Sequence, residues 1–400
     1  MYRGFLSSLS RKQWAWAAVG LGAVVVLILL GLSLGTAVPD REAGRLTLDM
    51  TLKEAAPVYE VTGSALAKEL GLALDAPKNV PMRELGVTEE RLRDAEAHLM
   101  GHAESTLKYY LYGAIVLWGW LFLVKIGRPE KAGLKRRKVW YPRVGYLVPV
   151  FLATVILGFV LGKSPSPMEG AVKLFKTMVG LYPDPLAKTA AFLFFIGLAV
   201  VGNKVVCGWA CPFGGLTELL YSIPWLKKAK RYKIPFWVSN SVRGGLFVLM
   251  LFVLFGIIGG NRGFVIHHLA NPFNLFNYEF EGLSILITVI VSLLAGLVIY
   301  RPFCQFICPF GFLSWIAERI SLYRVKVDHD ACTECGNCIR ACPIEAAKGR
   351  VEKKRFNADC FSCARCLNTC PVDALTYGFA FGKKRSEMIK ETNSMKRKLL

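Results

Sequence analysis

The sequence is poor in acidic residues and in histidine. Its 400 residues include 29 acidic and 50 basic side chains, a net charge of +21, and only five histidines. No histidine falls in the middle of an apolar stretch, so a stacked pair of membrane haems is not expected. The sequence also lacks a helix-turn-helix or RNA-recognition motif. Because the basic residues flank apolar stretches, they indicate membrane topology and contact with anionic lipid rather than nucleic acid.

Hydrophobic residues make up 54% of the chain, which excludes an ordinary soluble domain. Six apolar stretches are long enough, or nearly so, to cross a hydrocarbon core of about 30 Å. We expect a mainly α fold, a polytopic six-helix transmembrane bundle formed by Trp14–Val38, Tyr109–Lys125, Val144–Leu161, Thr189–Val206, Gly244–Gly260 and Leu283–Tyr300. No clear A-x-A site follows the first stretch, whose apolar region is too long for a cleaved signal peptide. It is therefore interpreted as an uncleaved anchor.

Loop charges predict the orientation of this bundle. The Gly127–Arg143 connection holds seven basic residues against Glu130 alone, and the Cys207–Val242 connection carries a run of five. By the positive-inside rule these connections and both termini are cytoplasmic, and so are all twelve cysteines. A multi-pass protein of a bacterial inner membrane is expected, and its reducing cytoplasmic side suits metal-ligand cysteines rather than disulfides.

Five parts of the chain are predicted from these patterns. They are an anchor helix (1–38), a small extracytoplasmic helical segment (39–107), the transmembrane bundle (108–322), a C-terminal α+β cysteine-rich domain (323–380) and a basic tail (381–400). In the second part, Leu66, Leu70 and Leu72 recur within one stretch, and Thr88-Glu-Glu-Arg resembles a helix start, so this part is expected to be helical.

A long-period repeat lies inside the predicted bundle. Lys204-Val-Val-Cys-Gly-Trp-Ala-Cys-Pro-Phe-Gly214 aligns with Arg301-Pro-Phe-Cys-Gln-Phe-Ile-Cys-Pro-Phe-Gly311 at an offset of 97 residues. The same offset carries the third and fourth apolar stretches onto the fifth and sixth. Two helical hairpins related by an axis along the membrane normal would place both cysteine pairs side by side.

The C-terminal cysteines form two identical patterns. Cys332, Cys335, Cys338 and Cys342 precede Pro343, and Cys360, Cys363, Cys366 and Cys370 precede Pro371, each as C-x2-C-x2-C-x3-C-P. This run resembles that of the bacterial dicluster ferredoxins and predicts a dicluster ferredoxin domain over 323–380. In this run three close thiolates bind one [4Fe–4S] cluster and the fourth binds the other. The predicted ligand sets are therefore Cys332, Cys335, Cys338 and Cys370 for cluster 1, and Cys360, Cys363, Cys366 and Cys342 for cluster 2. Zinc also uses CxxC pairs, but soft thiolates in this double run favour iron–sulfur clusters.

The other four cysteines form two C-x3-C-P pairs, Cys207 with Cys211 and Cys304 with Cys308. On a helix the i, i+4 spacing puts both sulfurs of a pair on one face. Together the pairs could hold a third iron–sulfur cluster, act as redox-active thiols or transient metal ligands, or be inert; the spacing does not decide. Lys204 and Arg301 each stand three residues before a pair, where a cation favours thiolate chemistry.

With these motifs the chain resembles the NapH/NosR-type membrane-bound 4Fe–4S polyferredoxins, over about Trp118 to Gly378. The resemblance implies a quinol dehydrogenase-like subunit that moves electrons between the quinone pool and a respiratory enzyme or partner redox protein. The implied partners are membrane lipid, quinone and other redox subunits or a ferredoxin. The 39–107 segment is too small for the flavin domain of NosR-type members. The alternative is an electron-donating maturation protein, or a redox-regulatory one, for metal-cofactor assembly.

Four of the histidines, His98, His102, His267 and His268, map to the predicted outer side. The cysteines map to the inner side, about 30 Å away across the hydrocarbon core. That separation is too long for one electron step, so a quinone site, if present, is expected near the C-x3-C-P pairs.

Overall fold

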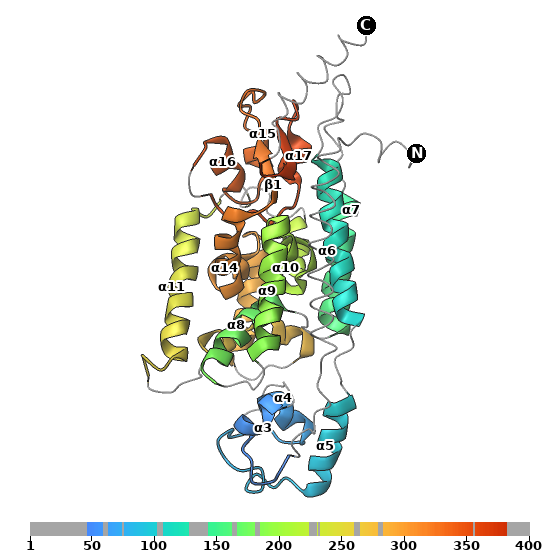
Figure 1. Cartoon of the computed structure of the whole chain (residues 1–400), viewed down its shortest axis with the longest axis vertical. Coiled ribbons are helices and arrows are strands. Elements are labelled where there is room, and N and C mark those ends of the chain that lie inside the picture. The colour runs from blue at the N-terminus through green and yellow to red at the C-terminus, as the bar shows by residue number, and fades with distance from the viewer. Residues whose placement is uncertain are drawn as a thin grey trace.

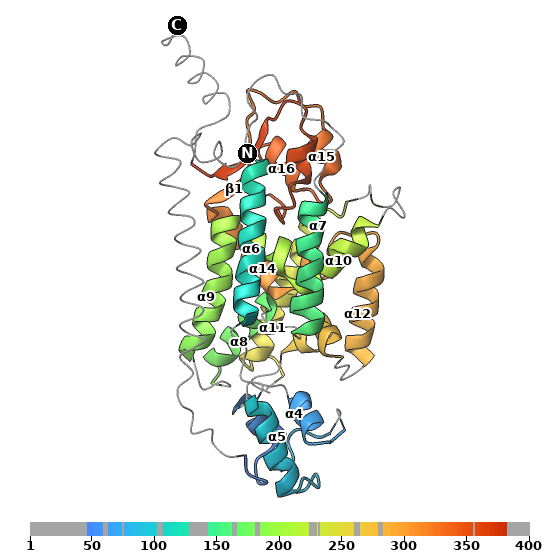
Figure 2. The same cartoon turned by 90° about the vertical axis from the view of Figure 1, so that its right-hand side faces the viewer.

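The computed structural model describes residues 46–58, 63–73, 76–101, 107–127, 143–161, 166–180, 185–223, 230, 233–259, 265–278, 283–354 and 357–381. In that part of the chain a small helical cap, a helical bundle and a compact cysteine-rich segment follow one another along the long axis (Figures 1 and 2). The predicted anchor Trp14–Val38, His102 and the basic tail beyond residue 381 lie outside the described residues.

The cap has its own small core. It contains α3 (Leu52–Val58), α4 (Gly63–Glu69) and α5 (Glu89–Gly101). Its fully buried apolar side chains include Leu52, Leu66, Leu70 and Met82. The cap lies at the end of the molecule opposite the cysteine-rich segment (Figure 1).

The bundle is built from apolar helices interrupted by short turns. Its elements are α6 (Leu107–Ile126), α7 (Arg143–Leu152), the π-helix η1 (Ala153–Val160), α8 (Pro167–Met178), α9 (Pro185–Gly202), the π-helix η2 (Val206–Ala210), α10 (Pro212–Ser222), α11 (Phe236–Leu254), the 3-10 helices η4 (Ile266–His268) and η5 (Pro272–Asn277), α12 (Leu283–Gly296), α13 (Pro302–Phe306), α14 (Pro309–Ala317) and the 3-10 helix η6 (Glu318–Ile320). Pro149 inside α7 has no N–H to donate, and the helix continues beyond it in the wider π form.

Helices occur at the five described stretches that the sequence marks as apolar. By length and composition, one helix of the described residues, Phe236–Leu254, is long and apolar enough to cross a membrane. Four shorter apolar helices accompany it, Tyr110–Ile126, Gly145–Val160, Lys188–Gly202 and Leu283–Gly296. The mainly helical fold is confirmed, and the six transmembrane spans stay a prediction.

The two predicted spans that precede the C-x3-C-P motifs end early, α9 at Gly202 and α12 at Gly296, and left-handed residues follow each of them. Asn203 and Lys204 have φ of 55° and 58°, and Arg301 has φ of 46°. These left-handed residues cannot continue a right-handed helix, so α9 stops at Gly202, and the chain after α12 turns again at Arg301. Lys204 and Arg301 are equivalent positions of the 97-residue repeat, so both halves break at the same place.

The cysteine-rich segment is a small α+β unit. Strand β1 (Tyr323–Val327) pairs antiparallel with β2 (Leu375–Phe379), Tyr323 lying opposite Phe379. Between the strands lie α15 (Asn337–Ala341), α16 (Ala346–Val351) and α17 (Arg365–Thr369). The backbone N–H of Tyr377 donates to Gly127 O at 3.2 Å, which joins this unit to the end of α6.

Candidate iron–sulfur centres

The eight C-terminal cysteines line two separate cavities. Those of the first are Cys332, Cys335, Cys338 and Cys370, and those of the second are Cys342, Cys360, Cys363 and Cys366. These are the two sets of four that the spacing predicts, three cysteines from one motif and one from the other. No three His, Cys, Asp or Glu side chains of the described residues are placed to chelate a single metal ion.

Local backbone geometry explains the exchange of the fourth cysteine. Each motif makes a left-handed turn, at Gly336 and at Ala364, and then enters a short helix, α15 or α17. Cys342 and Cys370 end these helices in an extended conformation, so the chain turns away from the helix there. The fourth sulfur of each motif therefore lies in the cavity of the other motif.

The two cavities differ in exposure. Cys335 is exposed, and the backbone N–H of Asn337, which bonds to its sulfur, lowers the pKa of this thiol. In the second set Cys342 is buried, and Cys360, Cys363 and Cys366 are half-buried. Ala374 N donates to Cys370 Sγ at 3.2 Å, a contact that suits a ligating thiolate. The first cavity is therefore nearer to solvent, and the donor sets of both fit a [4Fe–4S] cluster.

The four C-x3-C-P cysteines gather inside the bundle, and we call this set the thiol cage (Cys207, Cys211, Cys304 and Cys308). Cys207 lies in η2, Cys211 precedes α10, Cys304 lies in α13 and Cys308 precedes α14. Each is only 8% exposed. The thiols also interact electrostatically with one another across the two motifs. Both pairs thus meet at one place, as the repeat predicts.

Each half of the repeat holds the other by a basic side chain. Lys204 Nζ, in the first half, donates to Gly311 O in the second at 3.1 Å. Arg301, in the second half, donates to Cys207 O, and its Nη2 donates to Gly208 O at 2.8 Å. These reciprocal bonds satisfy backbone carbonyls of the two turns and fix the motifs against each other.

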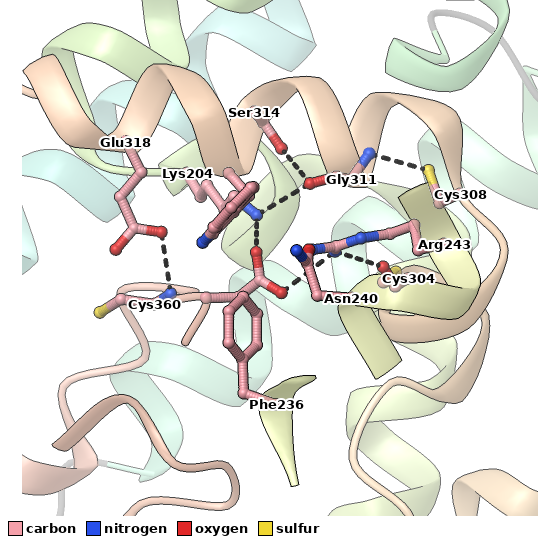
Figure 3. Close-up of polar contacts among 12 residues, drawn as sticks. Lys204, Phe236, Asn240, Arg243, Cys304, Cys308, Gly311, Ser314, Glu318 and Cys360 are labelled. Carbon is pink, nitrogen blue, oxygen red and sulfur yellow. Dashed lines mark hydrogen bonds and ion pairs between the residues drawn. The ribbon is translucent and has the colours of Figure 1, made fainter. Parts of the chain in front are cut away.

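The cage is surrounded by buried charge. Lys204, Arg243 and Arg301 are all 0% exposed. Asp359 binds the first two, with Arg243 Nη1 at 3.0 Å from its Oδ2, and Glu218 accepts from Arg301 at 3.3 Å (Lys204 and Arg243 are labelled in Figure 3). The three positive charges of these basic side chains outnumber the two negative charges of Asp359 and Glu218. This excess of positive charge suits a bound group that has four thiolate ligands and a net negative charge.

The second ferredoxin motif packs directly on the cage. Trp209 Nε1 donates to Ser362 O at 3.1 Å, and Asn203 Nδ2 donates to Cys360 O at 3.3 Å. A Cβ on Gly208 would lie 2.1 Å from Phe361 O, so this approach of two backbones requires glycine. The cavity of Cys342, Cys360, Cys363 and Cys366 is consequently the nearer one to the cage.

His267 packs against the second C-x3-C-P turn. Its Nε2 lies 3.0 Å from the carbonyl of Ile307, the residue before Cys308, and the side chain is 3% exposed. Facing a carbonyl, Nε2 must carry the hydrogen, and Nδ1 has no partner among the described residues. The outer-side location of His267 stays a prediction, and its contact with this turn was not expected from the sequence.

Sequence reasoning found Lys204 and Arg301 but missed Arg243, Glu218 and Asp359. The signal for Arg243 was present, because it is the one charged residue in the apolar helix Phe236–Leu254. A charge in such a helix faces the protein interior and has a partner. The partner, Asp359, is 116 residues away in sequence.

Comparison with known proteins gives the same two regions. A family described as a 4Fe-4S binding domain matches residues 189–233 and 281–327, which contain the thiol cage. A family described as a 4Fe-4S dicluster domain matches residues 324–371. No solved structure matches the chain.

The curated relatives are ferredoxin-type proteins. The ferredoxin-type protein NapH of Haemophilus influenzae is 28% identical over 166 residues, 40% of this chain and 55% of NapH. The methylamine utilization ferredoxin-type protein MauN of Methylorubrum extorquens is 30% identical over 196 residues, 48% of this chain and 64% of MauN. The chain thus spans only about half to two thirds of the length of these relatives.

Proposed function

Because this chain belongs to the NapH-type polyferredoxins, we propose that it moves electrons between the quinone pool and a respiratory enzyme or partner redox protein. Iron–sulfur electron transfer is the function shared by its ferredoxin-type relatives. The observation that supports transfer between the quinone pool and a partner protein is the order of the three cysteine sets. The thiol cage lies in the bundle, the half-buried set lies against it, and the exposed set around Cys335 lies beyond.

In this proposal each set of four cysteines holds one [4Fe–4S] cluster. When bound, such a cluster supplies reversible one-electron chemistry. Cys332, Cys335, Cys338 and Cys370 hold the first, Cys342, Cys360, Cys363 and Cys366 the second, and the thiol cage a third. Gly311 N donates to Cys308 Sγ at 3.3 Å, and the cage lies among buried cations, so thiolates can be stabilised there. These features favour a cluster over inert thiols.

We further propose that the bundle spans a bacterial inner membrane six times, with the ferredoxin segment and both termini in the cytoplasm. The two strongly basic connections support this orientation. One begins at Gly127, which bonds to Tyr377 of the ferredoxin segment. The other contains Lys233, whose Nζ donates to Ile339 O. The described residues Gly127 and Lys233 of these connections therefore lie at the ferredoxin end, where the positive-inside rule requires the cytoplasm.

The exposed cysteine set is the proposed contact with the partner. Cys335 and Glu334 are exposed on that face, and Arg340 beside them donates to Cys335 O at 3.2 Å. A redox protein that docks there would approach the first ligand set more closely than either of the others. The thiol cage, at the other end of the series, would face the quinone side.

Iron analysis tests the cofactor content. Anaerobically purified protein should contain about twelve iron atoms and as much acid-labile sulfide per chain, as three [4Fe–4S] clusters require. The Cys304→Ser variant should contain about eight. About eight in the unchanged protein would leave the thiol cage without a cluster, and zinc in place of iron would overturn the proposal.

Quinol oxidation is tested separately, in inverted vesicles. A quinol analogue should reduce the iron–sulfur signals in the electron paramagnetic resonance (EPR) spectrum. Intact clusters that no quinol reduces would contradict the quinone part while leaving electron transfer between other partners in place.

A further inference from the structure

Asp359 joins the two kinds of cysteine motif. It stands directly before Cys360 in the ferredoxin segment, and its side chain is only 3% exposed. Both of its oxygens bind cations of the bundle, Lys204 at Oδ1 and Arg243 at Oδ2. Burial opposes ionisation, but these cations outweigh it and hold the pKa of Asp359 below its usual range.

The same two cations hold the second C-x3-C-P turn. Lys204 Nζ donates to Gly311 O at 3.1 Å, and Arg243 Nη1 donates to Cys304 O at 3.0 Å (Figure 3). Arg243 Nη2 donates to Asn240 Oδ1 at 2.6 Å, one turn earlier on α11, which fixes the plane of the guanidinium group. One arginine thus touches the backbone of a cage cysteine and the residue beside a ferredoxin cysteine.

This bridge differs between the two halves of the repeat. The residue equivalent to Arg243 in the first half is Tyr146, at the offset of 97. Tyr146 is also buried, and its hydroxyl donates to Gly208 O at 3.4 Å. Only the second half carries a cation at this position, and Asp359 binds that cation in addition to Lys204.

Such an arrangement needs an explanation beyond stability. Buried ions lose their hydration, and a cluster of apolar side chains would often be as stable. What an ionic bridge adds is a fixed relative position, since each charge must keep its partner. Here the fixed parts are Cys304 and the Asp359–Cys360 peptide.

We propose that Arg243 is a positioning residue that, with Lys204 and Asp359, locks Cys360 onto the thiol cage and couples the two ligand sets. The coupling route runs from Cys304 O through the Arg243 guanidinium and the Asp359 carboxylate to Cys360. It serves the transfer of one electron between the two sets, in either direction, with no covalent bond made or broken and no proton moved. The coupling rests on the proposed function, because it requires an iron–sulfur cluster in both ligand sets. The locking of Cys360 onto the thiol cage does not depend on the proposed function.

Arg243→Met is the variant with the best chance of folding. It keeps the Lys204–Asp359 pair, so the carboxylate retains a buried counter-ion, and methionine retains much of the length. Arg319→Met is the matched control. Arg319 lies at the same interface, where its Nη2 donates to Asn357 O at 3.0 Å, two residues before Asp359.

Locking is measured on the full-length chain without iron, by the rate at which iodoacetamide alkylates Cys360, with exposed Cys335 as the internal reference. We expect Arg243→Met to raise the Cys360 rate about tenfold, the effect of about 1.4 kcal/mol on an opening equilibrium, and Arg319→Met to change it less than threefold. Equal rates in the two variants, raised or unchanged, would overturn the locking. This readout is independent of whether the cage holds a cluster.

Coupling is measured on the iron-loaded chain by EPR. The unchanged protein should show spin–spin splitting between the signals of the cage and of the nearer ferredoxin set. Arg243→Met should lose that splitting at unchanged iron content, and Arg319→Met should keep it. Arg243→Lys should restore the splitting only in part. Nη1 alone makes both the Asp359 and the Cys304 O contacts, so an ammonium group can replace them, but the lysine side chain is shorter and loses the Nη2 bond to Asn240. Splitting that survives in Arg243→Met would overturn the bridging route, whereas an iron content of about eight in the unchanged protein would instead contradict the third cluster of the proposed function.

Discussion

Gly208→Ala should separate the ferredoxin segment from the bundle. The new Cβ would lie 2.1 Å from Phe361 O, and contacts below 3.0 Å essentially do not occur, so one backbone must move by about 1 Å. Overpacking of this kind costs about 1–3 kcal/mol. The movement also strains the Trp209–Ser362 and Asn203–Cys360 hydrogen bonds, each worth about 1 kcal/mol. A total of about 3 kcal/mol corresponds to about a hundredfold more opening of the interface.

The assay is amide hydrogen exchange of residues 357–366, which follows the opening equilibrium when closing is fast. Exchange there should accelerate about a hundredfold in Gly208→Ala, while the cap helices α3–α5 stay unchanged. Gly245→Ala is the control, because no atom lies within 4 Å of its Cβ position and alanine favours the helix. Unchanged exchange in Gly208→Ala would refute the close packing of the two motifs.

Three further predictions concern single contacts. Cys370→Ser should remove the cluster of the first motif, and Cys342→Ser should remove the cluster of the second motif, each with a loss of about four iron atoms. If each variant instead lost the cluster of the motif in which the substituted cysteine stands, the exchange of the fourth ligand would be contradicted. His267→Leu should destabilise the turn before Cys308 by about 1–3 kcal/mol, since Ile307 O loses its donor, whereas His267→Gln should retain a donor; thermal release of iron compares the two variants. Thr51 N–H and hydroxyl bonds lower the pKa of Glu54, so its stabilisation of α3 is present above the unfolded-state pKa and is lost as pH falls through the folded-state pKa. The protection of α3 amides against hydrogen exchange should therefore decrease at acid pH. In Glu54→Gln this protection should no longer depend on pH in that range.

The cysteine sets could be predicted from sequence because their chemistry is local. Four cysteines within eleven residues, followed by proline, determine the turn, the short helix and the exchanged fourth ligand around Cys342 and Cys370. The repeat likewise predicts that Cys207 and Cys304 belong to one place, since equivalent residues of two similar hairpins lie about a common axis.

What the sequence did not predict depends on contacts between distant residues. Asp359 meets Lys204 and Arg243 across more than a hundred residues, and no local pattern marks such a pair. The contact of His267 with Ile307 O was not predicted, because apolar stretches were treated as straight spans with turns at their ends. The left-handed residues Lys204 and Arg301 break that rule, since the chain folds back into the bundle after each of them.

The reciprocal bonds of Lys204 and Arg301 have a consequence for how such a fold could arise. Each half supplies two sulfurs and a cation whose carbonyl partner belongs to the other half, so neither half is complete alone. A chain with one hairpin could assemble the four-sulfur set only as a pair of identical subunits, each inserting its cation into its neighbour. The two halves therefore have the relation of a symmetric dimer fused into one polypeptide, and the fusion left one position of each pair free to diverge, as Tyr146 and Arg243 have done.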